Sequence, residues 1–222
     1  PYLGENAIKK LMEGIPWVDK IGEYELELPD ELDDPIKSSL EYYMNIQNLT
    51  QEQKKAAKRL FNYPTVTCNI INGGVKINVV PDHATAEFDI RLTPGTQIHK
   101  VRRHLEELVE KSGIKGIETE PRKKESMKET ETAGYYESPN SNFANKLRET
   151  IEEATGKDPS LKILTGGTDG ISTSKIAGIP SLGYGTSLTG QAHQPNEYIT
   201  IENLVLGVKI YSAFPLNYRT RE

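Results

Sequence analysis

Hydrophobic residues recur at helical spacing in four separate stretches of the chain. The first stretch, residues 4–15, predicts an amphipathic helix whose inward stripe consists of Ile8, Leu11, Met12 and Ile15. Asn6 is expected to cap the start of this helix, and Gly14 to help to end it. The other three stretches predict helices over residues 98–108, 143–154 and 200–211.

The spacing of hydrophobic residues changes from helical to alternating in two places. Residues 66–70 and 84–92 alternate apolar and polar side chains, which predicts two half-buried antiparallel strands. A third, short strand is expected at 116–120. The order helix, strand, strand, helix, strand is that of a split βαβ, ferredoxin-like sandwich that lacks its first strand.

A polar stretch at residues 122–142 separates this α+β part from a second part, in which the order of expected helices and strands is different. There a helix is followed by an expected buried strand at 160–165, the glycine-rich turn GGTDG, a short helix, and another expected strand at 179–185. This alternation is typical of α/β folds. The final helix is expected to direct Leu204, Val208 and Tyr211 inward. We therefore expect two domains, 1–132 and 133–222, the second being about half of a complete one.

Residues 20–63 form an acidic region of the first domain. Within it, the stretch ELPDELDDPIKSS, residues 27–39, contains two prolines and a run of carboxylates, and we expect a solvated loop. A polar helix is expected to follow at residues 50–61.

Composition narrows the possible functions. A net charge of −5 argues against a general nucleic-acid binder, and no apolar run is long enough to span a membrane. The single cysteine, Cys68, cannot form an internal disulfide, which fits a reducing cytoplasm, and we expect it to be buried in a strand. The chain starts without methionine or a leading strand, so we expect it to begin within a longer protein.

The glycine-rich turn is the first candidate site. Gly166, Gly167, Thr168 and Asp169 lie between an expected strand and an expected helix, where backbone N–H groups can approach an anion. The turn is neither a Walker A motif nor GxGxxG. The alternative is a tight structural turn in which Asp169 caps the helix.

His193, in the stretch QAHQPNE, is the second candidate. A histidine on a loop after a strand, at the carboxyl edge of an α/β sheet, is a candidate zinc ligand, and the alternative is a surface turn. Catalytic zinc needs three or more protein ligands. Two of the other histidines, His99 and His104, lie on a helix among charged residues and are expected at the surface. The chain alone is therefore not expected to assemble a metal site.

Asn78 and Arg91 are the third candidate. Asparagine can donate hydrogen bonds to an oxyanion, and arginine can bind a carboxylate through two parallel hydrogen bonds. The alternative is that Asn78 shapes the turn before Pro81 and that Arg91 points to solvent.

Four motifs, in this order, resemble one family: PYLGENAI, NVVPDHATAEFDIR, GGTDG with AGIPSLGYG, and AHQPNE. The chain is similar to the co-catalytic zinc amidohydrolases, which include acetylornithine deacetylase, succinyl-diaminopimelate desuccinylase, aminoacylase, the carboxypeptidase G type and tripeptidase T. The resemblance implies a two-zinc catalytic domain interrupted by a ferredoxin-like lid that also forms a homodimer. The chain would then consist of the lid, without its first strand, and the C-terminal half of the catalytic domain. Residues 20–63 match the family least and look like an acidic insertion in the lid.

The resemblance also implies roles for individual residues. His193 matches a metal ligand, Asn78 a substrate or oxyanion contact, Arg91 a binder of the substrate's carboxylate, and Gly166–Asp169 the substrate loop. Each intact site would hold two zinc ions, with cobalt as an alternative metal. This chain would supply one ligand, and Glu197 would orient neighbouring groups or favour a helix start. The remaining ligands and the general base would precede Pro1, so the isolated chain is expected to be inactive.

The expected activity is hydrolysis of an amide or peptide bond in an N-acyl amino acid or small peptide. Many deacetylases of the family have an arginine shortly after the aspartate of the glycine-rich loop, whereas Gly170 and Ile171 stand here. This departure leaves a di- or tripeptidase open. Two other classes also stay open, a non-catalytic dimerisation module and a nucleotide-binding domain that uses GGTDG.

Overall fold

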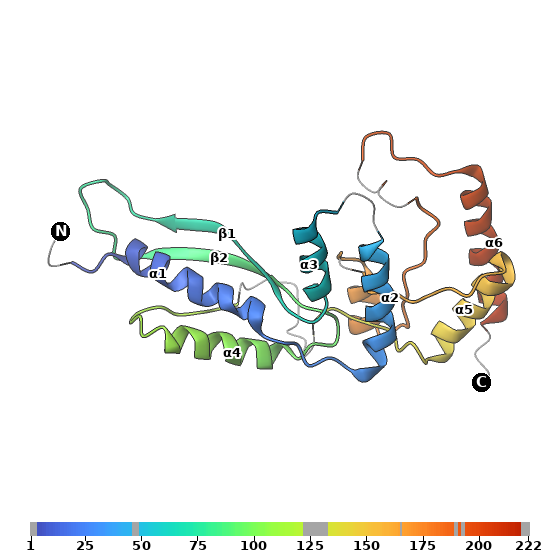
Figure 1. The fold of residues 1–222 in the computed structure, drawn as a ribbon, viewed down its shortest axis with the longest axis horizontal. Helices are drawn as coiled ribbons and strands as arrows, with labels where there is room; N and C mark the ends of the chain where they lie inside the picture. Colours follow the sequence, from blue (N-terminus) through green and yellow to red (C-terminus); the bar gives the residue numbers. More distant parts are fainter. Residues whose placement is uncertain are drawn as a thin grey trace. The chain divides into compact units, whose positions relative to one another are not determined.

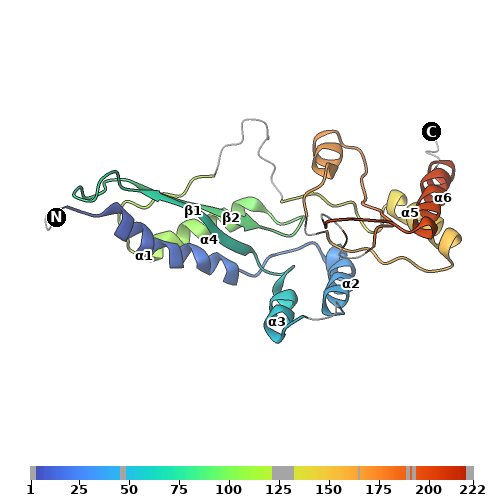
Figure 2. The ribbon, with the colours of Figure 1, turned by 90° about the horizontal axis from the view of Figure 1, so that it is seen from above.

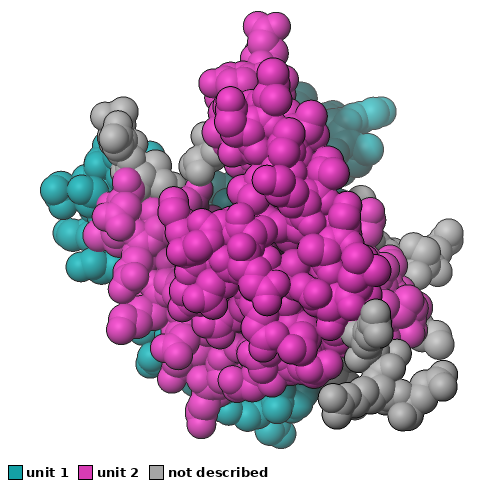
Figure 3. Space-filling view, turned by 90° about the vertical axis from the view of Figure 1, so that its right-hand side faces the viewer, with its two compact units in different colours: residues 1–28, 46–134 teal, residues 29–45, 135–222 magenta. Residues whose placement is uncertain are grey.

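The fold divides into two compact units, which Figure 3 colours separately. Unit 1 comprises Pro1–Leu28 and Ile46–Gly134, and unit 2 comprises Pro29–Asn45 and Tyr135–Glu222. The computed structural model describes residues 4–45, 49–121, 133–164, 166–188, 191 and 194–218. No helix in these ranges has both the length and the apolar character needed to cross a membrane.

Unit 1 is built on a long antiparallel hairpin of β1 (Thr65–Gly73) and β2 (Ala84–Arg91), with α1 (Ala7–Asp19) and α4 (Ile98–Lys111) beside it (Figure 1). The strands pair from Thr65 opposite Arg91 to Gly73 opposite Ala84, with an irregularity between Cys68 and Ile70. The short helix η1 (Lys20–Glu23) follows α1, and α3 (Gln51–Arg59) precedes the hairpin. Both predicted strands are confirmed. Cys68 is only half-buried.

The core of unit 1 lies between the hairpin and α4. Buried residues Ile21, Leu26, Val101 and Leu108 form this core. The paired residues Val66 and Ile90 pack against it from the sheet. The inward stripe predicted for residues 98–108 is therefore confirmed.

The first helix confirms one predicted end and corrects the other. Asn6 caps it, its side chain accepting a hydrogen bond from the backbone N–H of Lys9 at 3.1 Å. The helix runs past Gly14 and through Pro16 to Asp19. Gly14 instead allows a close approach, because a Cβ there would lie 2.5 Å from Cδ1 of Ile117. Met12, predicted to face inward, is 64% exposed.

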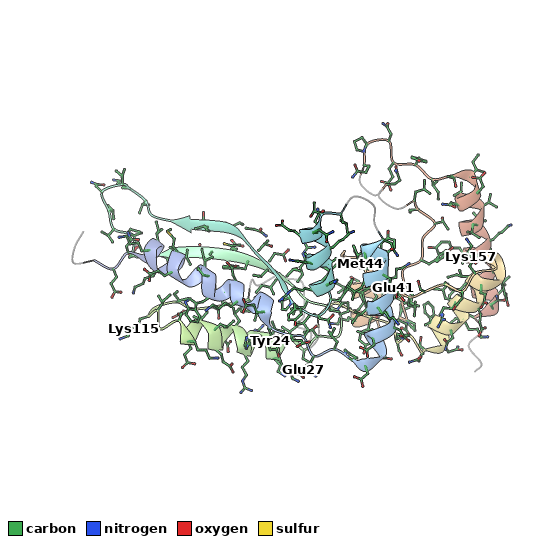
Figure 4. The ribbon with its side chains drawn as sticks, viewed as in Figure 1. Tyr24, Glu27, Glu41, Met44, Lys115 and Lys157 are labelled. Atoms are coloured by element: carbon green, nitrogen blue, oxygen red, sulfur yellow. The ribbon has the colours of Figure 1, made fainter. Side chains whose placement is uncertain are left out.

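Tyr24 and Glu27, labelled in Figure 4, lie beside α4. The Tyr24 ring packs on the ring of His104 with centroids 4.6 Å apart, and Glu27 forms an ion pair with Lys100. His104 is half-buried by this contact, and 30% of its side chain stays exposed. His99 is exposed, as predicted.

The acidic stretch is the largest correction to the predicted elements. It forms the short helix η2 (Asp30–Leu32) and α2 (Asp33–Met44), the latter labelled in Figures 1 and 2. Both belong to unit 2. Leu32 and Ile36 are buried, so the helix has an apolar face despite its carboxylates. Glu31 accepts hydrogen bonds from Tyr136 and Ser138, and the buried Ser39 bonds to the backbone of Ile163. These contacts within unit 2 explain why the stretch is not a loop.

The rest of unit 2 contains α5 (Asn142–Thr155), the short π-helix η3 (Ile171–Ile176) and α6 (Ile201–Asn217). Helices α5 and α6 pack on each other, with Phe143 and Phe214 in an edge-to-face contact at 5.2 Å. Ser141 caps α5, and Gly156 ends it at a left-handed φ of 68°. The bounds of α5 lie within one residue of the predicted range 143–154.

One face of α6 differs from its predicted orientation. Leu204, Val208 and Tyr211, expected inward, are 53%, 60% and 61% exposed. Gly207 and Ile210 are the buried residues of α6 instead. A helix that is apolar on most sides is typical of the interior of a larger domain.

Three predicted short strands are not formed. Residues 116–120, 160–164 and 179–185 have no strand assignment, and β1 and β2 are the only paired strands in the described ranges. A strand exists only when a neighbour supplies its ladder of hydrogen bonds. Sequence alternation marks a segment that suits a strand without showing that a partner is present.

Candidate active site

The glycine-rich loop is open to solvent. Gly166, Gly167, Thr168 and Asp169 are all exposed, and nothing lies within 4 Å of a Cβ built at Gly166 or Gly167. Thr168 Oγ1 accepts a hydrogen bond from the backbone N–H of Gly170 at 3.2 Å, which closes the turn. The backbone of the loop is therefore accessible, and its role as a substrate loop stays a prediction.

The loop leads into η3, whose backbone N–H groups hold the end of the loop by hydrogen bonds. The carbonyl of Asp169 accepts hydrogen bonds from the N–H groups of Ser172 and Thr173 at 2.9 and 3.1 Å. The cap position of this helix is Gly170, so the alternative in which Asp169 caps it is wrong. Thr173 is fixed in turn by a 2.7 Å hydrogen bond to Ser181.

Lys175 is the charged residue of η3. Burial lowers the pKa of its ammonium group below the usual lysine value, because desolvation disfavours the charged form. Its position, six residues after Asp169, places a cation in the element that follows the glycine-rich loop.

Tyr135 was missed by the sequence analysis. Its hydroxyl lies 3.0 Å from Thr168 Oγ1, and its ring lies against Gly170. The sequence signal was a Gly-Tyr-Tyr in a polar stretch, residues 134–136, which suggested only a domain boundary.

His193 itself lies outside the described residues, so its predicted metal contact stays a prediction. Its neighbours form a series of tight turns, with the N–H of Gln194 donating to Gln191 and that of Glu197 donating to Gln194. Asn196 has a left-handed φ of 61°, a conformation that asparagine tolerates better than most residues. The described residues Gln194–Glu197 thus form a turn that follows the histidine.

The segment before this loop is fastened to α6. The side chain of Asn203 donates to the carbonyl of Thr186 at 2.9 Å, and the Tyr211 hydroxyl donates to the carbonyl of Tyr184. Thr200 caps α6 by accepting from the N–H of Asn203. The histidine loop thus connects two segments that are both held by one helix.

Asn78 and Arg91 lie at opposite ends of the hairpin in unit 1. Arg91 pairs with Thr65 where the hairpin is joined to the rest of the unit, whereas Asn78 lies in the connection beyond Gly73 and Ala84. Strand geometry puts at least about 23 Å between Arg91 and the tip. Arg91 is exposed, and its Nε donates to Asp89 at 2.9 Å. The structure does not bring these two predicted residues together.

A groove in unit 2 lies away from the candidate site residues. This open groove of about 550 Å³ lies between the end of α5 and Leu206 of α6, beside Lys157 (Figure 4). None of the candidate site residues lines it.

The described residues do not make a metal site by themselves. Nowhere in the ranges that the structure describes do three or more His, Cys, Asp or Glu side chains gather to hold an ion. A metal in this protein would therefore need ligands beyond these residues, and His193 is the candidate in this chain.

Two family descriptions match the chain in tandem. Residues 1–116 match the peptidase dimerisation domain, and residues 116–217 match peptidase family M20/M25/M40. The chain belongs to the M20 peptidase family. Members of this family are metallopeptidases, so a metal cofactor is implied, and the predicted resemblance is confirmed.

Individual relatives of this M20 chain have related names. A probable carboxypeptidase of Aspergillus clavatus is 32% identical over 96 residues, which are 43% of this chain and 17% of that protein. A probable succinyl-diaminopimelate desuccinylase of Staphylococcus aureus is 35% identical over 97 residues, or 42% of this chain and 22% of that protein.

A solved structure confirms the fold class. An M20 family metallo-carboxypeptidase from Sulfolobus solfataricus matches with a TM-score of 0.55 and 23% identity, over 96% of this chain and 52% of that one. The chain therefore spans about half the length of this structure and less of the curated relatives. The mixed helix and strand architecture of M20 peptidases is the one that the sequence predicted.

Proposed function

We propose that this chain is the lid and the C-terminal part of the catalytic domain of a metal-dependent hydrolase. The enzyme would cleave an amide or peptide bond in an N-acyl amino acid or a small peptide. The tandem match to a peptidase dimerisation domain and to the M20 peptidase family carries the proposal. The open glycine-rich loop in unit 2 supports it, because a substrate loop must expose its backbone.

The exposed face of α6 supports the proposal that unit 2 is part of a larger domain. Leu204, Val208 and Tyr211 together expose more apolar surface than a surface helix normally does. The unpaired segments 160–164 and 179–185 point the same way, since strands of a shared sheet would satisfy them.

In the proposed site, His193 holds a zinc ion, and cobalt is the alternative metal. Such a metal lowers the pKa of a bound water and polarises the scissile carbonyl. Gly166, Gly167, Thr168 and Asp169 hold the substrate through the exposed loop. Glu197, four residues after His193, orients the ligand loop.

The distance along the hairpin constrains the roles of the lid residues. A small substrate cannot touch both Asn78 and Arg91 of one lid, because at least about 23 Å of strand separates them. We therefore propose a homodimer in which the two residues of a lid serve different active sites. Asn78 would donate to the oxyanion of one site, and Arg91 would bind the substrate's carboxylate in the other.

A substrate panel on the full-length protein tests the proposed function. The protein is stripped with a chelator, reloaded with zinc or cobalt, and offered N-acetyl and N-succinyl amino acids, dipeptides and tripeptides. Hydrolysis that disappears with the metal and returns on reloading is the expected result. The preferred substrate separates a deacylase from a peptidase, and a metal-loaded protein that cleaves none of them would contradict the proposal.

A further inference from the structure

The backbone conformation of Gly170 does not require a glycine. Its φ of −55° and ψ of −25° are ordinary right-handed helical values that any residue adopts. A Cβ at this position would, however, lie 1.9 Å from both Cζ and Oη of Tyr135, far inside van der Waals contact. The missing side chain of Gly170 is therefore the space into which the Tyr135 ring fits.

The Tyr135 hydroxyl makes a second contact with the same loop. It lies 3.0 Å from Thr168 Oγ1, which also accepts the N–H of Gly170 at 3.2 Å. A threonine hydroxyl has two lone pairs and one proton. When Tyr135 donates, both lone pairs are used, and the Thr168 proton is directed to a third group. The two contacts together fix the rotamer of Thr168 on the exposed face of the loop.

Tyr135 and the loop are distant in sequence but belong to the same unit. Tyr135 is the first residue of the second segment of unit 2, and Thr168 follows 33 positions later. Glycines elsewhere in the loop have no such neighbour, since nothing lies within 4 Å of a Cβ at Gly166 or Gly167. The loop is therefore anchored at one end by an aromatic ring and open at the other.

We propose that Tyr135 is a positioning residue for the GGTDG loop, and that the absence of a side chain at Gly170 leaves room for its ring. The packing of the Tyr135 ring on Gly170 follows from the observed contacts and does not depend on the proposed function. Its consequence for substrate binding rests on the proposed function, in which this loop holds the substrate. A side chain at position 170 would displace the end of the tyrosine ring, break its hydrogen bond to Thr168, and release the open part of the loop.

The test is a double-mutant cycle on the full-length protein, read first by hydrogen–deuterium exchange of peptides covering residues 166–171. Tyr135→Phe and Gly170→Ala are each expected to speed exchange there by about fivefold, the equivalent of one hydrogen bond. In a Tyr135→Ala background, Gly170→Ala is expected to add nothing, because the ring that it displaces is gone. Independent effects that multiply, or unchanged exchange in Gly170→Ala, would overturn the proposal.

Tyr136→Phe is the matched control, since it removes a hydroxyl from the adjacent tyrosine, which bonds to Glu31 instead. It is expected to leave exchange at 166–171 unchanged, and an equal effect would show that Tyr135 has no special role. With a substrate in hand, Tyr135→Phe is expected to raise KM about fivefold and to change kcat less than about twofold. If the wild-type protein hydrolyses nothing, the proposed function fails while the exchange cycle still decides the role of Tyr135.

Discussion

The hydroxyl of Ser39 accepts a hydrogen bond from the backbone N–H of Ile163 at 2.7 Å, across 124 residues of sequence. The same hydroxyl donates to the carbonyl of Pro35 at 2.7 Å, and Ser39 is only 1% exposed. This residue fastens the acidic helix α2 to the segment that precedes the glycine-rich loop. The acidic helix α2 is thus part of the structure that supports the candidate site.

Ser39→Ala is expected to destabilise unit 2. The substitution leaves the N–H of Ile163 without its partner, which costs about 1–3 kcal/mol when the group is buried. Urea unfolding of the full-length protein, followed by fluorescence, measures the change. Ser38→Ala, at a half-buried neighbour, is the control and should stay within about 0.5 kcal/mol of wild type. An equal decrease in the free energy of unfolding in the two variants would show that Ser39 has no special role in holding α2.

The raised pKa of the Tyr136 phenol predicts that the folded protein loses stability at alkaline pH. Burial, and then its hydrogen bond to Glu31, raise the pKa of the phenol above 10.0. Because the pKa is higher in the folded state, the protonated phenol stabilises the fold below about pH 10, and this contribution is lost as the pH rises through the folded-state value. The thermal midpoint of wild type should therefore fall more steeply above pH 10 than that of Tyr136→Phe. Parallel curves would show that Tyr136 titrates as it does in the unfolded chain.

Arg91 is expected to matter for binding and not for stability. Its guanidinium is exposed and bonded to Asp89, so Arg91→Ala should leave the free energy of unfolding within about 0.5 kcal/mol of wild type. Loss of a charged hydrogen bond to a substrate carboxylate should raise KM roughly ten- to a hundredfold. Arg91→Lys keeps the charge without the bidentate geometry and should recover part of the loss.

The control for Arg91 is Arg103→Ala, which removes an exposed arginine from α4. It should leave KM unchanged. A substrate amide that lacks the free carboxylate should bind wild type and Arg91→Ala equally well. A carboxylate-independent effect of Arg91→Ala would exclude the proposed role.

Most helices could be predicted from the sequence, because the spacing of apolar residues and the capping residues lie within each helical segment. The stripe of Val101, Leu105 and Leu108, and the cap of α5 at Gly156, follow from spacing and from a left-handed glycine. The hairpin followed from alternation of apolar and polar residues over 84–92. These features need no knowledge of distant contacts.

The errors arose where distant residues decide the structure. The acidic stretch became a helix because Ile163 and Tyr136, more than a hundred positions away, satisfy Ser39 and Glu31. The contact between Tyr135 and Gly170 depends on an approach that no sequence spacing encodes. The separation of Asn78 from Arg91 was also hidden, because thirteen residues span a long hairpin here and not a compact turn.

The proposed function depends most on His193 as a ligand of the catalytic metal. The decisive measurement is the metal content of the purified full-length protein, together with its rate of hydrolysis, for wild type, His193→Ala and His99→Ala. His193→Ala is expected to lose bound metal and to lose more activity than the about 10–100-fold typical of removing an outer-shell partner. His99→Ala, at an exposed position on α4, should match wild type in both. A His193→Ala protein that keeps its metal and its activity would contradict the account.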